Sequence, residues 1–343
     1  MSTYRAYQVT RRRQFELVER DVVDPEPGHV RVRVLSCGVC HSDVISVEGM
    51  RPHPSVPVVP GHEIVGVVDE VGPGVTAWQP GDRVGLGFLG GHCGECMHCR
   101  RGDFVYCTNQ PRPGSDTDGG YAEMVYARSS GLVRVPDGLE SLETAPMLCA
   151  GITTFNALRK TGAREGALVA IQGIGGLGHI GIQQSKQLGY RTVAIARGRD
   201  KAELATSLGA DDYIDSTATD PAGALQERGG AAVIVATASS GASMSPLVAG
   251  LEPHGQLVVV GAADPNDPIG VSTVDLIFGG RSIVGSLTGT PIENEDSLAF
   301  SAAHGIKPMT EIMPFEDAPK AYERMMSGAA RFRVVLDIAG ADA

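Results

Sequence analysis

Aromatic and basic residues are scarce in this sequence. Phe, Tyr and Trp make up 5% of the 343 residues, with a single Trp, and 29 Lys and Arg stand against 40 Asp and Glu, which gives a formal net charge of −11. Nucleic acids and anionic membrane surfaces attract clustered Lys and Arg. The short basic run at residues 11–13 is expected to be a solvated face, so we predict that the chain binds neither nucleic acid nor a membrane.

Long hydrophobic runs are also lacking. No apolar segment has the length of a membrane span, and residues 1–14 lack the apolar stretch of a secretory signal, so we expect a cytoplasmic protein. Thiols stay reduced in that compartment. The seven cysteines, an odd number, are therefore expected to be metal ligands or catalytic groups rather than a disulfide framework.

The hydrophobic pattern divides the chain into two kinds of segment. With 42% hydrophobic residues, the sequence predicts two domains with real cores. Up to about residue 150, short alternating runs broken by Pro and Gly indicate an irregular β domain. From about 151 to 286, continuous apolar runs alternate with helical stretches, which is typical of a parallel sheet covered on both faces. The tail from about 287 carries a further helix and strand, which we expect to pack on the first domain, giving an α/β fold.

Four cysteines in the stretch GHCGECMHCRRGDFVYC give the strongest local signal. They are separated by two, two and seven residues, and thiolates so close in sequence can close a tetrahedron around one zinc ion. Four protein ligands leave no open position, so this zinc is expected to be structural. The cysteines are Cys93, Cys96, Cys99 and Cys107, and the neighbouring His92 and His98 are expected to be surface residues.

A glycine-rich turn gives the second signal. The stretch QGIGGLG, residues 172–178, follows an apolar run and precedes a helical pattern. A GxGxxG alone is weak evidence, but between a strand and a helix it indicates a dinucleotide site, with the pyrophosphate at the helix N-terminus. The glycines concerned are Gly173, Gly175, Gly176 and Gly178.

The stretch LSCGVCHSDV allows two interpretations. Cys37 and Cys40 form a CxxC pair after a predicted strand, as a redox dithiol does, but the same residues can hold a metal. The segments PGHEIVG and APMLCAG add His62 and Cys149. Together with Cys40 they form a Cys, His, Cys set with an open fourth position, as a catalytic zinc requires.

With these motifs assembled, the chain resembles a zinc-dependent alcohol dehydrogenase of the medium-chain dehydrogenase/reductase superfamily. The resemblance covers essentially the whole chain through GVCHSD, PGHE, GDRV, the four-cysteine lobe, LCAGITT, GIGGLG and ARFRVVLD. It implies a GroES-like catalytic domain formed by residues 1–150 and 287–343, with a Rossmann coenzyme-binding domain at residues 151–286.

The resemblance also implies roles for individual residues around two zinc ions per chain. Cys40, His62 and Cys149 would bind the catalytic zinc, and Cys37 would be a buried bystander. Four further residues lie in matching motifs. Glu63 stands beside the metal and exchanges with water, Asp43 orients the ligand histidine, Ser42 takes the alcohol proton, and His41 meets the pyrophosphate. Arg333, in ARFRVVLD, is assigned to the cofactor.

The substrate side of the resemblance is less complete. Many relatives carry a histidine three residues beyond Ser42 as the last protein station of a proton relay, but here that position is Ile45. Protons are therefore expected to leave through water and the cofactor ribose. Ser42, Phe88 and Leu89 suggest a mainly apolar pocket for an alcohol, aldehyde or ketone, although Phe88 and Leu89 could equally be ordinary core residues.

Other functions remain open at this point. The chain could be a zinc polyol or amino-alcohol dehydrogenase or a reductase of a C=N group, although polyol enzymes commonly replace the third ligand with Glu and here it is Cys149. It could also be a cofactor-binding protein that has lost catalysis, although such relatives usually lose zinc ligands. The family further implies a homodimer or homotetramer that pairs through coenzyme domains.

The identity of the nicotinamide cofactor depends on the stretch TVAIARGRDK, residues 192–201. An NAD site usually has Asp or Glu at the end of its second strand, where the carboxylate binds the ribose hydroxyls. Here that residue is Ala196, and Arg197, Arg199 and Lys201 follow. A 2′-phosphate would meet positive rather than negative charge, so the sequence favours NADP(H) over NAD(H). The alternative is an NAD site that lacks its acid, with solvated loop charges.

Overall fold

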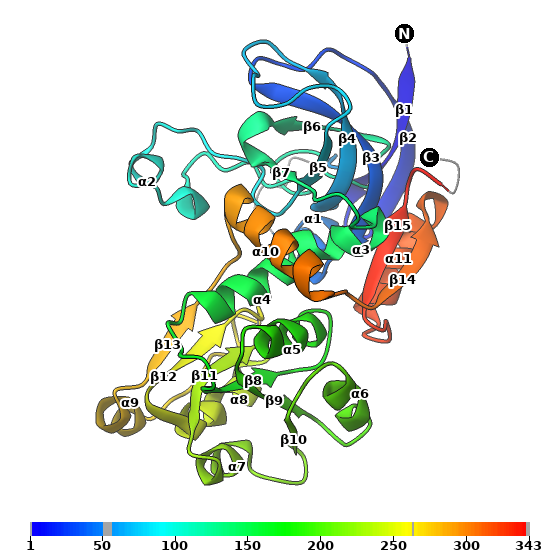
Figure 1. Ribbon diagram of the computed structural model, residues 1–343. Helices are drawn as coiled ribbons and strands as arrows, with labels where there is room; N and C mark the ends of the chain where they lie inside the picture. The colour runs from blue at the N-terminus through cyan, green and yellow to red at the C-terminus, as the bar shows by residue number, and fades with distance from the viewer. Residues whose placement is uncertain (1, 51–56, 263, 341–343) are drawn as a thin grey trace. The chain divides into compact units, whose positions relative to one another are not determined.

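The computed structural model of the protein describes residues 2–50, 57–262 and 264–340. The chain forms two compact units (Figure 1). The first unit comprises Met1–Ile152, Gly289–Ala303 and Lys307–Ala343, and the second comprises Thr153–Thr288 and His304–Ile306. The chain therefore forms nearly all of the second unit in one continuous segment between two parts of the first, and enters it again only at His304–Ile306.

A mixed sheet of seven strands forms the first unit. The strand order is β14-β15-β3-β4-β5-β7, and β6 pairs with β3 off this path. A separate hairpin consists of β1 (Thr3–Arg11) and β2 (Gln14–Asp21). The strands of the large sheet are β3 (His29–Val39), β4 (Glu63–Val71), β5 (Arg83–Leu86), β6 (Met124–Arg128), β7 (Leu132–Arg134), β14 (Thr310–Pro314) and β15 (Arg333–Asp337). Because β15 pairs antiparallel with β3, the C-terminal tail joins the N-terminal sheet, as expected from the sequence.

Alternation in β3 explains how this sheet forms its core. Val30, Val32 and Val34 are buried in one cluster with Ile64 and Val68 of β4, whereas the arginines between these valines are not buried. A period of two places alternate side chains on the core face. The strand then becomes continuously buried from Ser36 onward and ends directly before Cys40.

Short helices connect the strands of the first unit. They are η1 (His41–Asp43), α1 (Val44–Val47), α2 (Met97–Arg100), η2 (Phe104–Tyr106), η3 (Ser129–Gly131), α3 (Ser141–Thr144), η4 (Ala145–Leu148), η6 (Phe315–Asp317) and α11 (Ala318–Met326). Two longer helices run across the unit boundaries, α4 (Ala150–Arg159) and α10 (Pro291–His304).

The second unit contains a six-stranded sheet in the order β10-β9-β8-β11-β12-β13, and every pair in it is parallel. The strands are β8 (Leu168–Gln172), β9 (Arg191–Ala196), β10 (Asp212–Asp215), β11 (Ala231–Ala236), β12 (Leu251–Val259) and β13 (Ser282–Gly285). The helices are α5 (Gly178–Gln187), α6 (Ala202–Ser207), α7 (Pro221–Glu227), α8 (Gly241–Met244), η5 (Ser245–Gly250) and α9 (Thr273–Gly279).

This arrangement confirms the predicted parallel sheet. Every residue of β8 is buried, and α5 packs against β8 and β9. Such a strand has no solvated face, which is why its sequence is continuously apolar. Within the described part of the chain, no helix is long and apolar enough to span a membrane.

Candidate metal and coenzyme sites

Two groups of metal-binding side chains form among the described residues, and both lie in the first unit. One consists of the four lobe cysteines, and the other consists of Cys40, His62, Glu63 and Cys149. Within each group the potential ligand atoms all lie within 4.8 Å of one another. The sequence selected all of these residues, Glu63 as a residue beside the metal and the other seven as ligands, and the fold brings together positions up to 109 residues apart.

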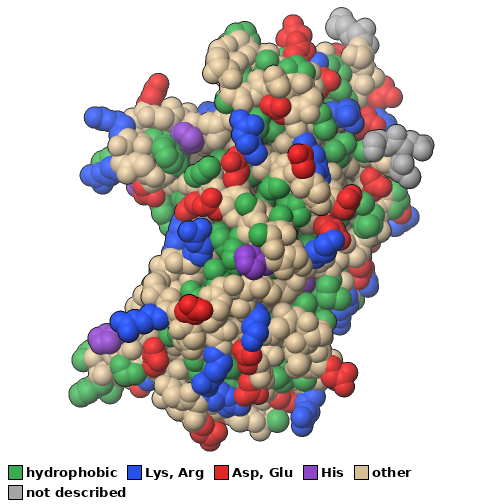
Figure 2. Space-filling view, viewed as in Figure 1, with side chains coloured by type: hydrophobic (Ala, Val, Ile, Leu, Met, Phe, Trp, Pro, Cys, Tyr) green, Lys and Arg blue, Asp and Glu red, His purple; other side chains and the backbone are tan. Residues whose placement is uncertain are grey.

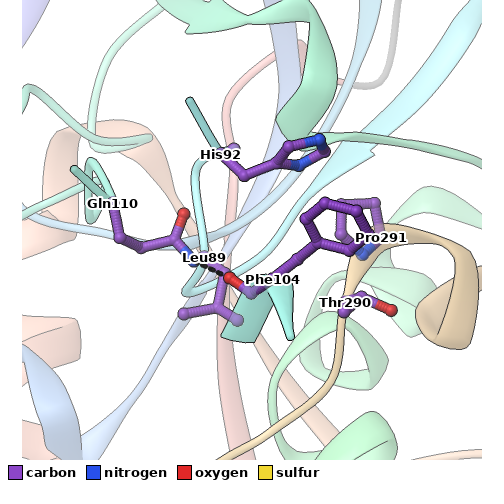
Figure 3. Close-up of a pocket in the computed structure, with 7 residues that line it drawn as sticks. Leu89, His92, Phe104, Gln110, Thr290 and Pro291 are labelled. Atoms are coloured by element: carbon purple, nitrogen blue, oxygen red, sulfur yellow. Dashed lines mark hydrogen bonds between the residues drawn. The ribbon is translucent and has the colours of Figure 1, made fainter. Parts of the chain in front are cut away.

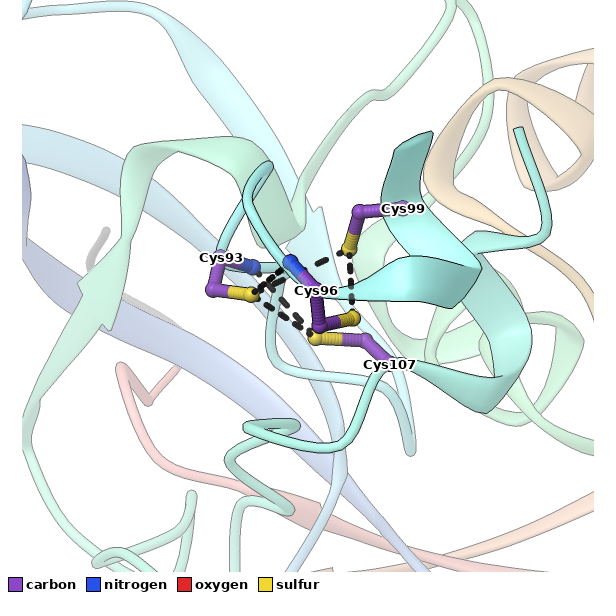
Figure 4. Close-up of side chains that lie close together, drawn as sticks. All are labelled: Cys93, Cys96, Cys99 and Cys107. Carbon is purple, nitrogen blue, oxygen red and sulfur yellow. Dashed lines mark hydrogen bonds between the residues drawn. The ribbon is translucent and has the colours of Figure 1, made fainter. Parts of the chain in front are cut away.

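The lobe cysteines converge on a small volume (Figure 4). The Sγ atoms of Cys96 and Cys99 are 3.5 Å apart, and those of Cys93 and Cys107 are 3.6 Å apart. Backbone N–H groups of Cys99 and Thr108 lower the pKa of the Cys96 thiol to about 5. A thiolate stabilised in this way is the form that binds metal.

Neither lobe histidine belongs to this group. The His92 ring packs against Phe104 with a centroid separation of 4.3 Å, and His98 Nδ1 lies 3.1 Å from the carboxylate of Asp103. Both are therefore engaged elsewhere, and four sulfurs remain to fill a tetrahedron.

Strand pairing assembles the second group. Cys40 follows the last residue of β3, His62 directly precedes β4, and Gly38 of β3 is paired with Glu63 of β4. Cys149 follows η4, and its Sγ lies 3.9 Å from that of Cys40. The two neighbouring strands therefore deliver three of the side chains, and the η4 turn delivers the fourth.

The imidazole of His62 is oriented by hydrogen bonding. Its Nδ1 lies 3.0 Å from Oδ1 of Asp43, which matches the role predicted for that carboxylate. Its Nε2 is buried and has no hydrogen-bond partner among residues 2–50, 57–262 and 264–340. A buried nitrogen lone pair without a donor, facing two thiols, fits a metal ion.

Asp43 has a further partner that the sequence did not reveal. The hydroxyl of Tyr121 donates to Oδ2 of Asp43 at 3.0 Å, and the backbone N–H of Cys40 donates to the same oxygen at 3.0 Å. Tyr121 is 78 residues away in the chain, so no local pattern could indicate this contact.

Charge is distributed unequally over the two thiols of this group. A hydrogen bond with Cys149, together with the positive charge of His62, holds the pKa of the Cys40 thiol well below its ordinary value. The same hydrogen bond and burial raise the pKa of Cys149. Burial opposes the charged form of His62, but the negative charges of Cys40 and Asp43 prevail and raise its pKa. A dication would replace these protons and remove the imbalance.

Glu63 and Arg333 form a buried ion pair beside this group. Arg333 Nη2 contacts Oε1 of Glu63 and donates to the carbonyl of Val39 at 3.4 Å. Burial raises the pKa of Glu63 to about 8 against the opposing charge of Arg333. Its Oε2 has no partner in the described part of the chain, and a Cβ added to Gly38 would lie 1.9 Å from that atom. Only glycine therefore leaves room for the carboxylate. Arg333, assigned to the cofactor from the sequence, contacts Glu63 and Val39 within the first unit.

Cys37 lies outside the metal-binding group. Its side chain is fully buried, its Sγ donates to the carbonyl of Gly38 at 3.5 Å, and burial raises its pKa well above the ordinary value. A thiol that stays protonated in the core is a poor nucleophile. This environment agrees with a bystander role and not with a redox dithiol.

The residues selected for the substrate side lie in different surroundings. In η1, His41 is exposed and Ser42 is half-buried, and the following helix α1 carries the half-buried Ile45. The Phe88 ring lies edge-on to His62 with a centroid separation of 5.3 Å, so it stands beside the metal-binding group.

Leu89 instead contributes to a small pocket at the base of the lobe (Figure 3). This pocket is lined by Leu89, Gly91, His92, Phe104, Gln110, Thr290 and Pro291. None of these residues belongs to the group around Cys40, so the two residues chosen for the pocket wall have different neighbours.

The glycine turn of the second unit has the geometry that a dinucleotide needs. Gly173 has φ of +91°, and a Cβ on Gly178, the first residue of α5, would lie 1.7 Å from the carbonyl oxygen of Gly173. No atom lies within 4 Å of the position of a Cβ on Gly175. Gly176 continues the turn. The first and last glycines are thus required by the backbone, and the middle of the turn is open to a pyrophosphate.

Positive charge lies next to this turn. Ala196 ends β9, Arg197 and Arg199 are exposed, and Lys201 Nζ donates to the carbonyl of Ile174 at 2.7 Å. The parallel partner of Ala196 is Asp215 on β10.

The Asp215 carboxylate is engaged by its own loop. Its Oδ1 accepts hydrogen bonds from the hydroxyl of Thr217 at 2.7 Å and from the backbone N–H of Gly198 at 2.8 Å. The Thr217 hydroxyl and these backbone donors lower the pKa of Asp215. It is therefore ionised, with its charge compensated locally.

Comparison with known proteins gives matches to both halves of the chain. Residues 26–137 match the alcohol dehydrogenase GroES-like domain, and residues 176–303 match the zinc-binding dehydrogenase domain. Alcohol dehydrogenase patD of Penicillium expansum is 42% identical over 312 residues, 91% of each chain. An alcohol dehydrogenase of Geobacillus stearothermophilus is 41% identical over 91% of this chain and 92% of its own length. The solved structure of a cinnamyl alcohol dehydrogenase from Sorghum bicolor is 30% identical, with a TM-score of 0.89 over 99% of this chain and 98% of that one.

Proposed function

Because the chain belongs to the zinc-type alcohol dehydrogenases of the medium-chain dehydrogenase/reductase superfamily, we propose that it transfers hydride between an alcohol and NADP(H). The reverse reaction reduces an aldehyde or ketone. The observation that carries this proposal is the buried His62 Nε2, which has no hydrogen-bond partner in the described part of the chain and lies with the thiols of Cys40 and Cys149.

Cys40, His62 and Cys149 would hold the catalytic zinc, and Asp43 would keep the His62 ring in place. A zinc ion held by these three residues would keep an open fourth position and would supply polarisation of the oxygen of an alcohol or carbonyl group. Glu63, paired with Arg333, supplies a buried carboxylate beside this position. The four lobe cysteines would hold a second, structural zinc with no open position.

Ser42 would pass the substrate proton toward the cofactor ribose. Its hydroxyl is half-buried in η1, two residues after Cys40. Ile45 has no group that can carry a proton, so we propose that the proton continues through ribose hydroxyls and water. His41 is exposed and adjacent to Ser42, and we assign it to the cofactor pyrophosphate. We retain Arg333 as a further residue proposed to bind the cofactor.

The cofactor would bind by its pyrophosphate at the turn formed by Gly173, Gly175, Gly176 and Gly178. Arg197 and Arg199 provide donors for a 2′-phosphate, and Ala196 does not repel it. The nearest carboxylate of the adjoining strand, Asp215, is occupied by hydrogen bonds of its own loop. These features support NADP(H) over NAD(H).

The substrate would be a small alcohol, aldehyde or ketone with an apolar body. Phe88 stands edge-on to His62, where an apolar substituent of the substrate would lie. We retain Ser42 and Leu89 as the other proposed pocket residues.

Homo-oligomerisation is supported by an exposed apolar surface on the second unit. Phe278 and Ile277 of α9 are 88% and 74% exposed, and Ile283 and Val284 of β13 are also exposed. In Figure 2, hydrophobic side chains gather at the end of the molecule where α9 lies. Among the described strands β13 pairs with β12 alone, so its outer edge could pair with β13 of a second copy.

Metal analysis of Cys149→Ser tests the proposed function. We expect two zinc ions in the wild-type chain and one in the variant, which should lose turnover but still bind NADP(H), because the glycine turn is untouched. Cys37→Ser is the matched control and should keep both ions. A wild type with one zinc, combined with full turnover in Cys149→Ser, would refute the catalytic assignment.

A further inference from the structure

We propose that Tyr121 is a positioning residue for the metal site formed by Cys40, His62 and Cys149, and that it acts through Asp43. The inference rests on the proposed function, because it assumes that metal occupies this site. It concerns a residue that carries no ligand atom and was not selected by any sequence motif.

The backbone around Tyr121 is fixed to the segment that leads into His62. Gly119 N donates to the carbonyl of Val59 at 2.7 Å, Gly120 N to that of Gly61 at 3.0 Å, and Tyr121 N to that of Pro60 at 3.0 Å. The carbonyl of Tyr121 accepts from the backbone N–H of Tyr7 at 2.8 Å. Tyr121 therefore cannot shift without moving the residues that directly precede His62.

The ring of Tyr121 lies against Gly61, a position at which only glycine fits. Gly61 has φ of +98°, and a Cβ there would lie 2.6 Å from Cδ1 of the Tyr121 ring. The side chain of Tyr121 is fully buried in the core of the first unit. The absence of a side chain on Gly61 thus allows the ring to pass, and the packing fixes where its hydroxyl points.

The hydroxyl completes a set of three donors around one buried carboxylate. Oδ2 of Asp43 accepts from Tyr121 and from the backbone of Cys40, and Oδ1 lies 3.0 Å from Nδ1 of His62. Asp43 and His62 are each only 2% exposed. In such a dry environment, hydrogen bonds to a carboxylate are strong and directional.

These contacts give Tyr121 a defined effect on the metal site. With its hydroxyl present, the carboxylate plane of Asp43 is held from the side opposite His62, so the imidazole keeps one orientation and Nε2 keeps one direction. Burial, followed by the negative charge of Asp43, raises the pKa of Tyr121, so the phenol remains protonated and acts as a donor. Without the hydroxyl, Oδ2 of Asp43 would keep only the backbone N–H of Cys40 as a donor, and the carboxylate would hold His62 less firmly.

The alternative is that Tyr121 merely fills the core. Tyr7 provides a matched control, because it belongs to the same buried cluster and its hydroxyl donates to a backbone carbonyl, that of Glu316, at 2.9 Å. Tyr7→Phe removes one partly buried hydroxyl hydrogen bond, and Tyr121→Phe removes one buried hydroxyl hydrogen bond. Only the second removes a bond to Asp43.

The experiment measures the rate at which zinc is released into a chromogenic chelator. The kinetic phase that is present in the wild type and missing in Cys149→Ser reports release from the Cys40 site. Outer partners of metal ligands typically change metal affinity by about 10- to 100-fold. Tyr121 reaches the ligand His62 only through Asp43, one hydrogen bond further out than Asp43 itself. We therefore expect zinc release from this site to be roughly tenfold faster in Tyr121→Phe, at the lower end of that range. Tyr7→Phe should release zinc at the wild-type rate.

Two further measurements separate positioning from stability. In Co²⁺-loaded Tyr121→Phe, the visible absorption bands of the Cys40 site should shift while those of the lobe site do not. In an Asp43→Ala background, Tyr121→Phe should cause no additional change in zinc release, because the side chain that accepts from the Tyr121 hydroxyl is gone.

The results distinguish this inference from the proposed function. Wild-type release rates and cobalt bands in Tyr121→Phe, or an equal effect of Tyr7→Phe, would overturn the positioning role and leave the metal site intact. A wild-type protein that binds no metal at Cys40, His62 and Cys149 would overturn both.

Discussion

At the scale of single residues, the predicted cofactor preference depends on the side chains at the end of β9. Ala196 has no charge to offer a ribose or to repel a phosphate, and Arg197 follows it on the surface. Arginine presents a planar fork of donors that suits a phosphate dianion. The choice between two cofactors that differ by one phosphate therefore depends on two adjacent positions.

Substitution of both Ala196 and Arg197 should reverse the cofactor preference. We expect the wild type to favour NADP in kcat/KM, and Ala196→Asp combined with Arg197→Gln to favour NAD. Each charged hydrogen bond lost contributes about 1.5–3 kcal/mol, so the change in the ratio should be at least roughly tenfold. Arg191→Gln, at the opposite end of β9, is the control and should leave the ratio unchanged. A wild type that already prefers NAD would contradict the assignment.

At the scale of elements, the predictable parts are those set by local pattern. The strands around β3, β4, β8, β9 and β11 follow from alternation or continuous apolarity, and the lobe cysteines follow from their spacing. The short edge strand β10 was not predicted, because Asp occupies both of its ends and only Tyr213 and Ile214 are apolar. The segment MSPLVAGL contains the last residue of α8 followed by the 3-10 helix η5, with Pro246 near the start of η5, and not one continuous α-helix.

The contacts that refine the metal site were not predictable from pattern. The hydroxyl of Tyr121 reaches Asp43 over 78 residues, and Arg333 reaches Glu63 over 270. The need for glycine at Gly38 likewise depends on where the Glu63 carboxylate falls after β3 and β4 pair. Each depends on strand register and side-chain direction in the folded state, which no local sequence window contains.

The four-cysteine lobe is the element that we expect to depend most on a bound metal. Its helices α2 and η2 contain four and three residues, far too short to be stable alone. Of the four sulfur-bearing residues, only Cys99 and Cys107 are buried. Local order in this lobe therefore depends on a bond network that zinc would provide.

Loss of the lobe zinc should destabilise the protein more than it alters chemistry. We expect Cys96→Ser to lower the thermal midpoint by at least about 5 °C, which corresponds to a loss of more than about 1 kcal/mol for a chain of this size. Cys149→Ser should lower it less, because that site is framed by paired strands. Calorimetry of both variants checks the order, and an unchanged midpoint in Cys96→Ser would show that the lobe holds without metal.

At the scale of the whole molecule, two sheet edges carry exposed apolar residues. β14 ends the sheet of the first unit and exposes Ile312, and β13 ends the sheet of the second unit and exposes Ile283 and Val284. The edges differ in their surroundings. β14 is flanked by the ion pair of Glu311 with Arg324 and ends at Pro314, which are features that discourage strand addition.

The β13 edge has the opposite character. Its four residues carry no charge, and α9 adds Val274, Ile277 and Phe278 to the exposed apolar surface nearby in the chain. An exposed, uncharged edge is a template for pairing, and exposure of large apolar side chains on this scale marks an interaction surface. Pairing with a second copy would provide hydrogen-bond partners for the backbone of β13 and would bury the apolar side chains.

Charge placed on the β13 edge should therefore separate the oligomer. We expect the wild type to have the mass of a dimer or tetramer by light scattering, and Val284→Lys combined with Phe278→Lys to reduce it, because buried unpaired charges at an interface are costly. Ile312→Lys on β14 is the matched control, since it places the same charge on the other exposed edge, and it should leave the mass unchanged. Circular dichroism should be the same for all three proteins. A monomeric wild type, or dissociation by Ile312→Lys alone, would show that β13 is not the contact and that the apolar surface of α9 serves another purpose.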